Sequence, residues 1–86
     1  MKHLTNQQQE TAVIAMEEMA ELTQVLSKLI RFGYTSDKTE HLIQEMGDVL
    51  LLHRLLQNTF GIEDNSLDEA MLRKQHKLMA WSSLYE

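Results

Sequence analysis

The positions of the helix-breaking residues limit this 86-residue chain to a few long helices. The chain has no proline, and its three glycines stand at positions 33, 47 and 61. Gly33 and Gly61 each follow a long segment whose apolar residues recur at a spacing close to 3.6, and glycine often ends a helix. No segment alternates apolar and polar residues at period two, so we expect an all-α fold without strands.

The first two helices are bounded by these glycines. We expect the first helix to run from Thr5 or Asn6 to Phe32, and the second from about Lys38 to Thr59 or Phe60. Ser36 or Asp37 is the expected N-cap of the second helix, because both side chains can accept a hydrogen bond from the first turn. A short polar linker joins the two helices, and we expect them to form an antiparallel hairpin.

A third helix is expected from about Leu67 to Trp81. Ser66 and Glu69 have the spacing of a capping box at its start. There is no repeat, low-complexity tract or linker, so we interpret residues 1–86 as a single domain. A domain of this size buries only about 60–65% of its unfolded surface. Because there is no cysteine to form disulfides or zinc–thiolate sites, we expect self-association into an oligomeric helix bundle.

Charge and hydropathy argue against two classes of partner. The chain has 13 acidic and 8 basic residues, a formal charge of −5 that disfavours broad contacts with nucleic acid or anionic lipid. No apolar stretch approaches the ~20 residues of a membrane span, and the first residues lack the apolar run of a signal peptide. We therefore expect a soluble, cytoplasmic protein that binds neither a nucleic acid polymer nor a membrane.

Acidic residues of the first helix share a face with apolar ones. At about 100° per residue, two acids and three apolar residues fall within a stripe ~60° wide, namely Ile14, Glu18, Glu21, Val25 and Phe32. Glu17 lies at the edge of this stripe. Carboxylates in an apolar setting are rarely buried unless they are paired or bound to a metal, so this stripe indicates a cationic partner.

The second helix repeats this arrangement. Glu45 and Asp48 are three residues apart and are surrounded by leucines and valine. The nearby basic residues are too few to neutralise both acidic pairs. Carboxylates without cysteine select hard cations, of which Mg²⁺ is the default and Mn²⁺ or Ca²⁺ a substitute. Either acidic pair alone is more typical of a solvated face, so the prediction depends on both pairs meeting in the hairpin.

The two motifs resemble those of the MazG-like all-alpha nucleotide pyrophosphohydrolases. The first is Glu17-Glu18-Met19-Ala20-Glu21, and the second, after 23 intervening residues, is Glu45-Met46-Gly47-Asp48. The segments from Glu21 to Gly33 and from Glu45 to Leu50 are similar to the compact, often phage-encoded members. The resemblance covers about residues 10–60.

This resemblance implies a function and a set of roles. Members of the family hydrolyse nucleoside triphosphates to the monophosphate and pyrophosphate, and they assemble their helices into bundles, which implies a dimer or tetramer here. It implies Mg²⁺ binding by Glu18, Glu21, Glu45 and Asp48. Glu17 matches the remaining acid, which binds metal or orients the attacking water in this interpretation.

Other polar residues receive weaker assignments. Lys28 lies on the acid-bearing side of the first helix and is a candidate for substrate phosphates, as are Arg73, Lys74 and Lys77. For each of them an ordinary solvated charge is the favoured interpretation. His41 lies one turn before Glu45, and we interpret it as structural rather than as part of the site.

Two other functions remain open. Phosphoribosyl-ATP pyrophosphohydrolase has a similar fold and acidic motifs, but its first motif lacks the run here from Ser27 to Gly33. The chain could also be a non-catalytic helical interaction module in which the acids bind a structural Mg²⁺ or Ca²⁺.

Overall fold

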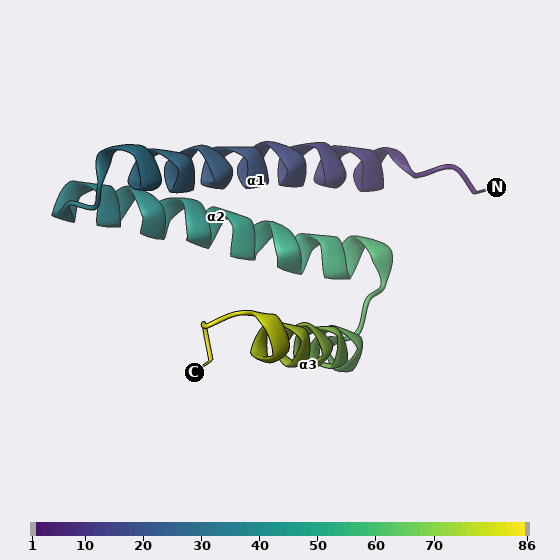
Figure 1. Cartoon of the computed structure of the whole chain (residues 1–86). Helices are drawn as coiled ribbons and strands as arrows, with labels where there is room; N and C mark the ends of the chain where they lie inside the picture. Colours follow the sequence, from purple (N-terminus) through teal and green to yellow (C-terminus); the bar gives the residue numbers. More distant parts are fainter. Residues whose placement is uncertain (1, 86) are drawn as a thin grey trace.

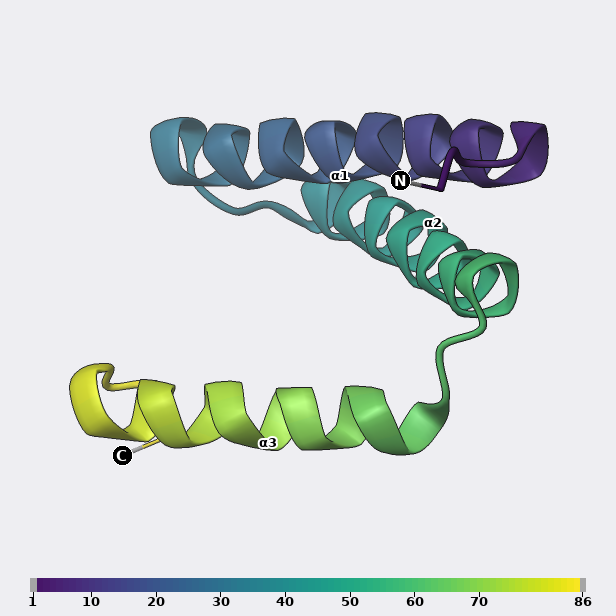
Figure 2. The ribbon, with the colours of Figure 1, turned by 90° about the vertical axis from the view of Figure 1, so that its right-hand side faces the viewer.

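The computed structural model describes residues 2–85 and is all-helical over that range. It contains three helices, α1 (Asn6–Phe32), α2 (Ser36–Phe60) and α3 (Asp64–Trp81), and no strand in the described residues. α1 and α2 lie side by side and run in opposite directions (Figure 1), whereas α3 stands apart from both (Figure 2). The expected all-α class with three helices is confirmed. None of these helices combines the length and apolar character that crossing a membrane requires.

α1 has the bounds expected from the sequence. Its N-cap is Thr5, whose hydroxyl accepts a hydrogen bond from the Gln8 backbone N–H at 3.1 Å. The Thr5 N–H in turn donates to Gln8 Oε1 at 2.9 Å, which completes a capping box. The Gln8 amide also donates to the Thr59 carbonyl at 3.4 Å, so it ties the start of α1 to the end of α2.

The predicted start of α2 was wrong by two residues. The helix begins at Ser36, and its N-cap is Thr35 rather than Ser36 or Asp37. The Thr35 hydroxyl makes no capping hydrogen bond to the helix and donates instead to the Asp37 carboxylate at 2.6 Å. This hydrogen bond is the main reason why the pKa of Asp37 lies below its usual value.

The predicted start of α3 was wrong by three residues. The helix begins at Asp64, so Ser66 lies inside the first turn and does not cap the helix with Glu69. The Gln57 side-chain amide at the end of α2 donates to the Asp64 carboxylate at 2.8 Å. Asp64 also complements the positive end of the α3 dipole. A contact with α2 and the helix dipole therefore favour this earlier start.

A seam of residues at alternating steps of three and four joins α1 to α2, as in a coiled coil. Its members are buried or half-buried: Thr11, Ala15, Glu18, Leu22, Val25 and Leu29 from α1, and Leu42, Glu45, Val49, Leu52, Leu56 and Thr59 from α2. The predicted stripe on α1 was therefore misplaced, because Ile14 and Phe32 are 38% and 67% exposed. The seam is centred one residue away, on Ala15, Leu22 and Leu29, where α2 covers the helix.

This arrangement leaves an unusually open molecule. The radius of gyration is 15.8 Å, against about 12 Å for a compact chain of this length. The accessible surface is 7298 Å², about 2,000 Å² more than the roughly 5,200 Å² of a typical folded monomer of this mass. The chain alone therefore forms only a thin core along the seam.

Gly47, inside α2, and Gly61, at its C-cap, should respond oppositely to substitution by alanine. Gly61 has φ 64° and ψ 40° at the helix C-cap, a left-handed conformation that disfavours a Cβ, so Gly61→Ala should lower the free energy of unfolding by about 1 kcal/mol. Gly47 lies inside α2 with open space where a Cβ would be. Gly47→Ala should therefore raise the free energy of unfolding by about 0.5–1 kcal/mol. Urea unfolding followed by circular dichroism measures both, and a destabilising Gly47→Ala would contradict this account.

Candidate metal centre

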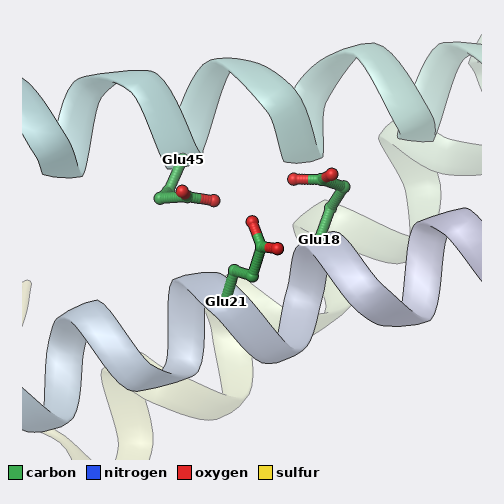
Figure 3. Close-up of side chains that lie close together, drawn as sticks. All are labelled: Glu18, Glu21 and Glu45. Carbon is green, nitrogen blue, oxygen red and sulfur yellow. The ribbon is translucent and has the colours of Figure 1, made fainter.

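Three predicted site residues converge across the seam. Glu18 and Glu21 come from α1 and Glu45 from α2, and one carboxylate oxygen of each lies within 4.8 Å of the others. Figure 3 shows the three side chains pointing into the space between the two helices. The antiparallel register explains this convergence, because Glu18 and Glu45 are seam residues and Glu21 lies one turn after Glu18 at the edge of the seam.

The carboxylates of Glu18 and Glu45 are insufficiently paired. Glu45 is only 9% exposed. Among the described residues, Oε2 of Glu45 and Oε2 of Glu18 are buried and have no hydrogen-bond partner. Oε1 of Glu45 lies 3.5 Å from Nε2 of His41, whose side chain is about half exposed. Buried carboxylate oxygens without donors are unfavourable, so this cluster has the chemistry of a cation-binding site.

Burial and mutual repulsion change the acidity of the cluster. Burial is the main reason why the pKa of Glu18 and the pKa of Glu45 are raised above their usual value. The charges of Glu21 and Asp48 raise both pKa values further, and His41 partly offsets this effect at Glu45. Glu18 and Glu45 therefore hold their protons more tightly than isolated carboxylates do.

The two remaining predicted acids lie outside this group of three. Asp48 is exposed, but its charge affects Glu18 and Glu45, so it lies near the cluster on the open side of the seam. Glu17 is exposed on α1. Their assignment to the site stays a prediction.

A small cavity of about 40 Å³ adjoins the cluster through His41. Lys28 lines it together with Lys38 and His41, and with the apolar side chains of Val25 and Leu29. The Lys38 ammonium also donates to the Gly33 carbonyl at 2.9 Å. Lys38 was not predicted from the sequence, although it precedes Glu45 by seven residues and so shares its helix face.

The donor set fits a hard divalent cation. All three converging groups are carboxylates, which suit Mg²⁺ or Mn²⁺. An octahedral Mg²⁺ ion at 2.0–2.1 Å spaces its ligands by at most about 4.2 Å, so modest rotations of flexible glutamates would bring these oxygens into range. Glu18, Glu21 and Glu45 would hold the ion.

Comparison of the chain with protein-family models, with curated proteins and with solved structures gave no match. The resemblance to the MazG-like enzymes therefore stays a prediction from the two acidic motifs. The convergence of Glu18, Glu21 and Glu45 is a separate, geometric observation.

The raised pKa values of Glu18 and Glu45 predict a pH-dependent stability without metal. Because the folded protein binds these protons more tightly, the two groups favour folding most below pH 4.5, the usual carboxyl pKa. That contribution is lost as pH rises through the raised folded pKa. Glu45→Gln should therefore raise the melting temperature in chelator at neutral pH, relative to the unmodified protein, and the gain should shrink in acid.

In added Mg²⁺ or Mn²⁺, the unmodified protein should instead have a higher melting temperature than Glu45→Gln. The ion binds ionised carboxylates, so it should raise the melting temperature of the unmodified protein at neutral pH, but less in acid. Glu45→Gln should remove most of this response, whereas Glu40→Gln, an exposed acid on the same helix, should keep it. An equal metal response in Glu45→Gln and the unmodified protein would rule out a metal centre at this cluster.

Proposed function

We propose that this chain is a Mg²⁺-dependent hydrolase that converts nucleoside triphosphates, NTP or dNTP, to the monophosphate and pyrophosphate. The observation that carries the proposal is the set of underpaired carboxylates between α1 and α2. An acidic site binds an acidic triphosphate only through a bridging cation, and divalent metals suit displacement at phosphorus. The spacing of the two acidic motifs, which resembles the MazG-like family, supports this reaction among others that use carboxylate-bound metal.

Each acid has a proposed role in this reaction. Glu18, Glu21, Glu45 and Asp48 would hold Mg²⁺, with Mn²⁺ as a substitute. When bound, the ion would supply positive charge to the phosphate oxygens and lower the pKa of a water at the site. The water oxygen attacks phosphorus in line, the bond between the α and β phosphates breaks, and pyrophosphate leaves.

A carboxylate must accept the proton of the attacking water. Glu17 is one candidate from the motif, and it would act by orienting or deprotonating the water. No covalent intermediate is needed.

The assembly and surroundings of the enzyme belong to the same proposal. The helical hairpin of α1 and α2 would associate into a dimer or tetramer, in which a bundle of helices covers the open surface described above. We place this enzyme in the cytoplasm, where nucleoside triphosphates are found.

Two alternatives keep some support. Phosphoribosyl-ATP pyrophosphohydrolase would use the same acids, and turnover of phosphoribosyl-ATP but not of dNTPs would favour it. A non-catalytic interaction module with a structural Mg²⁺ or Ca²⁺ is favoured by the large exposed apolar surface.

A substrate panel tests the proposed reaction. Purified protein with Mg²⁺ should release pyrophosphate from at least one of the eight common NTPs and dNTPs. Glu45→Gln and Asp48→Asn should each lower kcat by orders of magnitude, about 10²-fold or more, while circular dichroism and the oligomer mass stay unchanged. Glu40→Gln serves as the control on the same helix. Absence of pyrophosphate from all eight nucleotides would reject the hydrolase, and a metal-dependent melting shift would then favour the interaction module.

Lys28 should contribute to substrate binding. It lines the cavity beside His41, so its ammonium can pair with a phosphate of a metal-bound triphosphate. Lys28→Ala should raise KM about tenfold, as expected for one lost charged hydrogen bond, with a smaller change in kcat. Arg31 lies three residues after Lys28 on α1, and its charge stacks on the Phe32 ring. Arg31→Ala is therefore the control, and it should leave KM unchanged. Equal effects of the two substitutions would assign Lys28 to general surface charge.

A further inference from the structure

α1 and α2 share an apolar face that the seam does not use. Its members each directly follow a seam residue, and all are exposed: Met16, Met19, Leu26 and Ile30 from α1, and Ile43, Met46 and Leu50 from α2. The next residue along a helix points about 100° away from the one before it, always in the same rotational sense. Because α1 and α2 run in opposite directions and their seams face each other, the residues that follow seam residues on both helices point to the same side of the helix pair. The seven side chains therefore form one continuous surface, called here the apolar face.

The opposite face has a different chemistry. It consists of residues that directly precede a seam residue, and most of them are polar, including Glu17, Glu21, Lys28, His41 and Asp48. Three exposed apolar residues, Ile14, Leu51 and Leu55, lie on the same face. The acid cluster therefore opens on one side of the helix pair, and the apolar face lies on the other. Partners of the two faces do not compete for the same surface.

The apolar face carries no formal charge, although the chain as a whole has a charge of −5. The other positions that directly follow seam residues also hold no Asp, Glu, Lys or Arg: Ala12, Thr23, His53, Gln57 and Phe60. A two-fold dimer interface joins the same surface of both copies, so a surface with a net charge would repel its own copy. The apolar face avoids this repulsion and has the composition of a homodimer core.

The excess exposed area of the whole chain is of the size that a stable dimer buries. The chain exposes 7298 Å², about 2,000 Å² above the value typical of its mass. Two copies that removed this excess would bury about 4,000 Å² in total, within the range of about 2,000–5,000 Å² for obligate homodimers. The surface of α3 contributes part of this excess, because α3 packs on neither α1 nor α2 in the described chain.

We propose that the apolar face binds the same face of a second copy, so that α1 and α2 of two chains form a four-helix bundle. The acid clusters then lie on the two outer sides of the bundle and stay accessible to metal and nucleotide. This inference deepens the self-association proposed above by naming its surface. It does not require hydrolysis, because it follows from burial and charge alone.

A pair of matched substitutions tests the surface. Leu50 and Leu51 are consecutive on α2 and similarly exposed, at 63% and 56%, but only Leu50 belongs to the apolar face. Sedimentation equilibrium should find the unmodified protein as a dimer or a multiple of one. Leu50→Glu should raise the dimer dissociation constant about 100-fold or more, as for a residue central to an interface, whereas Leu51→Glu should change it about twofold at most.

Cross-linking tests the surface without a destabilising charge. The described chain contains no cysteine, so Met46→Cys and Leu51→Cys each introduce a single thiol. Met46 lies near the middle of the apolar face, so Cys at 46 should form covalent dimers with a short bifunctional maleimide. Cys at 51 should form far fewer.

Three results would overturn the proposal. They are a monomeric unmodified protein, equal dissociation of Leu50→Glu and Leu51→Glu, and a dimer in which Cys at 46 does not cross-link. In the last case another surface, such as α3 of either copy, covers the apolar face. None of these results alters the metal response of Glu40→Gln and Glu45→Gln or the release of pyrophosphate, so this inference fails separately from the proposed metal site and hydrolysis.

Discussion

Two carboxylic acids at core positions of a helix pair are the constraint on which the rest of this structure depends. Glu18 and Glu45 occupy seam positions where a coiled coil normally has leucine or valine, and Ala15, Val25 and Leu52 hold the seam closed around them. Burial raises the pKa of both acids, and each keeps one buried oxygen without a donor. An apolar pair at these positions would pack more stably, so the acids have a stability cost that a bound cation would offset.

The same seam explains why the molecule is open. A single line of contacts between α1 and α2 covers one stripe of each helix, and the residues on either side of that stripe stay exposed. On one side most of these residues are polar, and they include Glu21 and Asp48. On the other side they are apolar, from Met16 to Leu50. A chain with one thin seam therefore presents two surfaces of different character. The polar side can bind a cation, and the apolar side can bind the apolar side chains of a partner.

Local sequence signals predicted the parts of the fold that local physics controls. Gly33 and Gly61 ended the first two helices as expected, because few other residues adopt the positive φ found at both positions. The starts of α2 and α3 were missed, because the Asp64 contact with Gln57 and the Thr35 contact with Asp37 replaced the predicted caps. The stripe on α1 was misplaced for a related reason: the partner helix decides which of several adjacent stripes becomes the seam. The acidic motifs still predicted the meeting of Glu18, Glu21 and Glu45, since a shift of one residue leaves them near the seam.

A cation at this cluster would act on folding as well as on chemistry. Glu18 and Glu21 belong to α1 and Glu45 to α2, so an ion bound to all three joins the two helices at the middle of their seam. Binding to the folded state alone stabilises it in proportion to the logarithm of the ion concentration. Because the seam is the only packed contact between helices in the described chain, this cross-link would stabilise the same helix pair that presents the apolar face. Metal binding and self-association would then stabilise the same arrangement of α1 and α2. They would use different residues, on opposite sides of the helix pair.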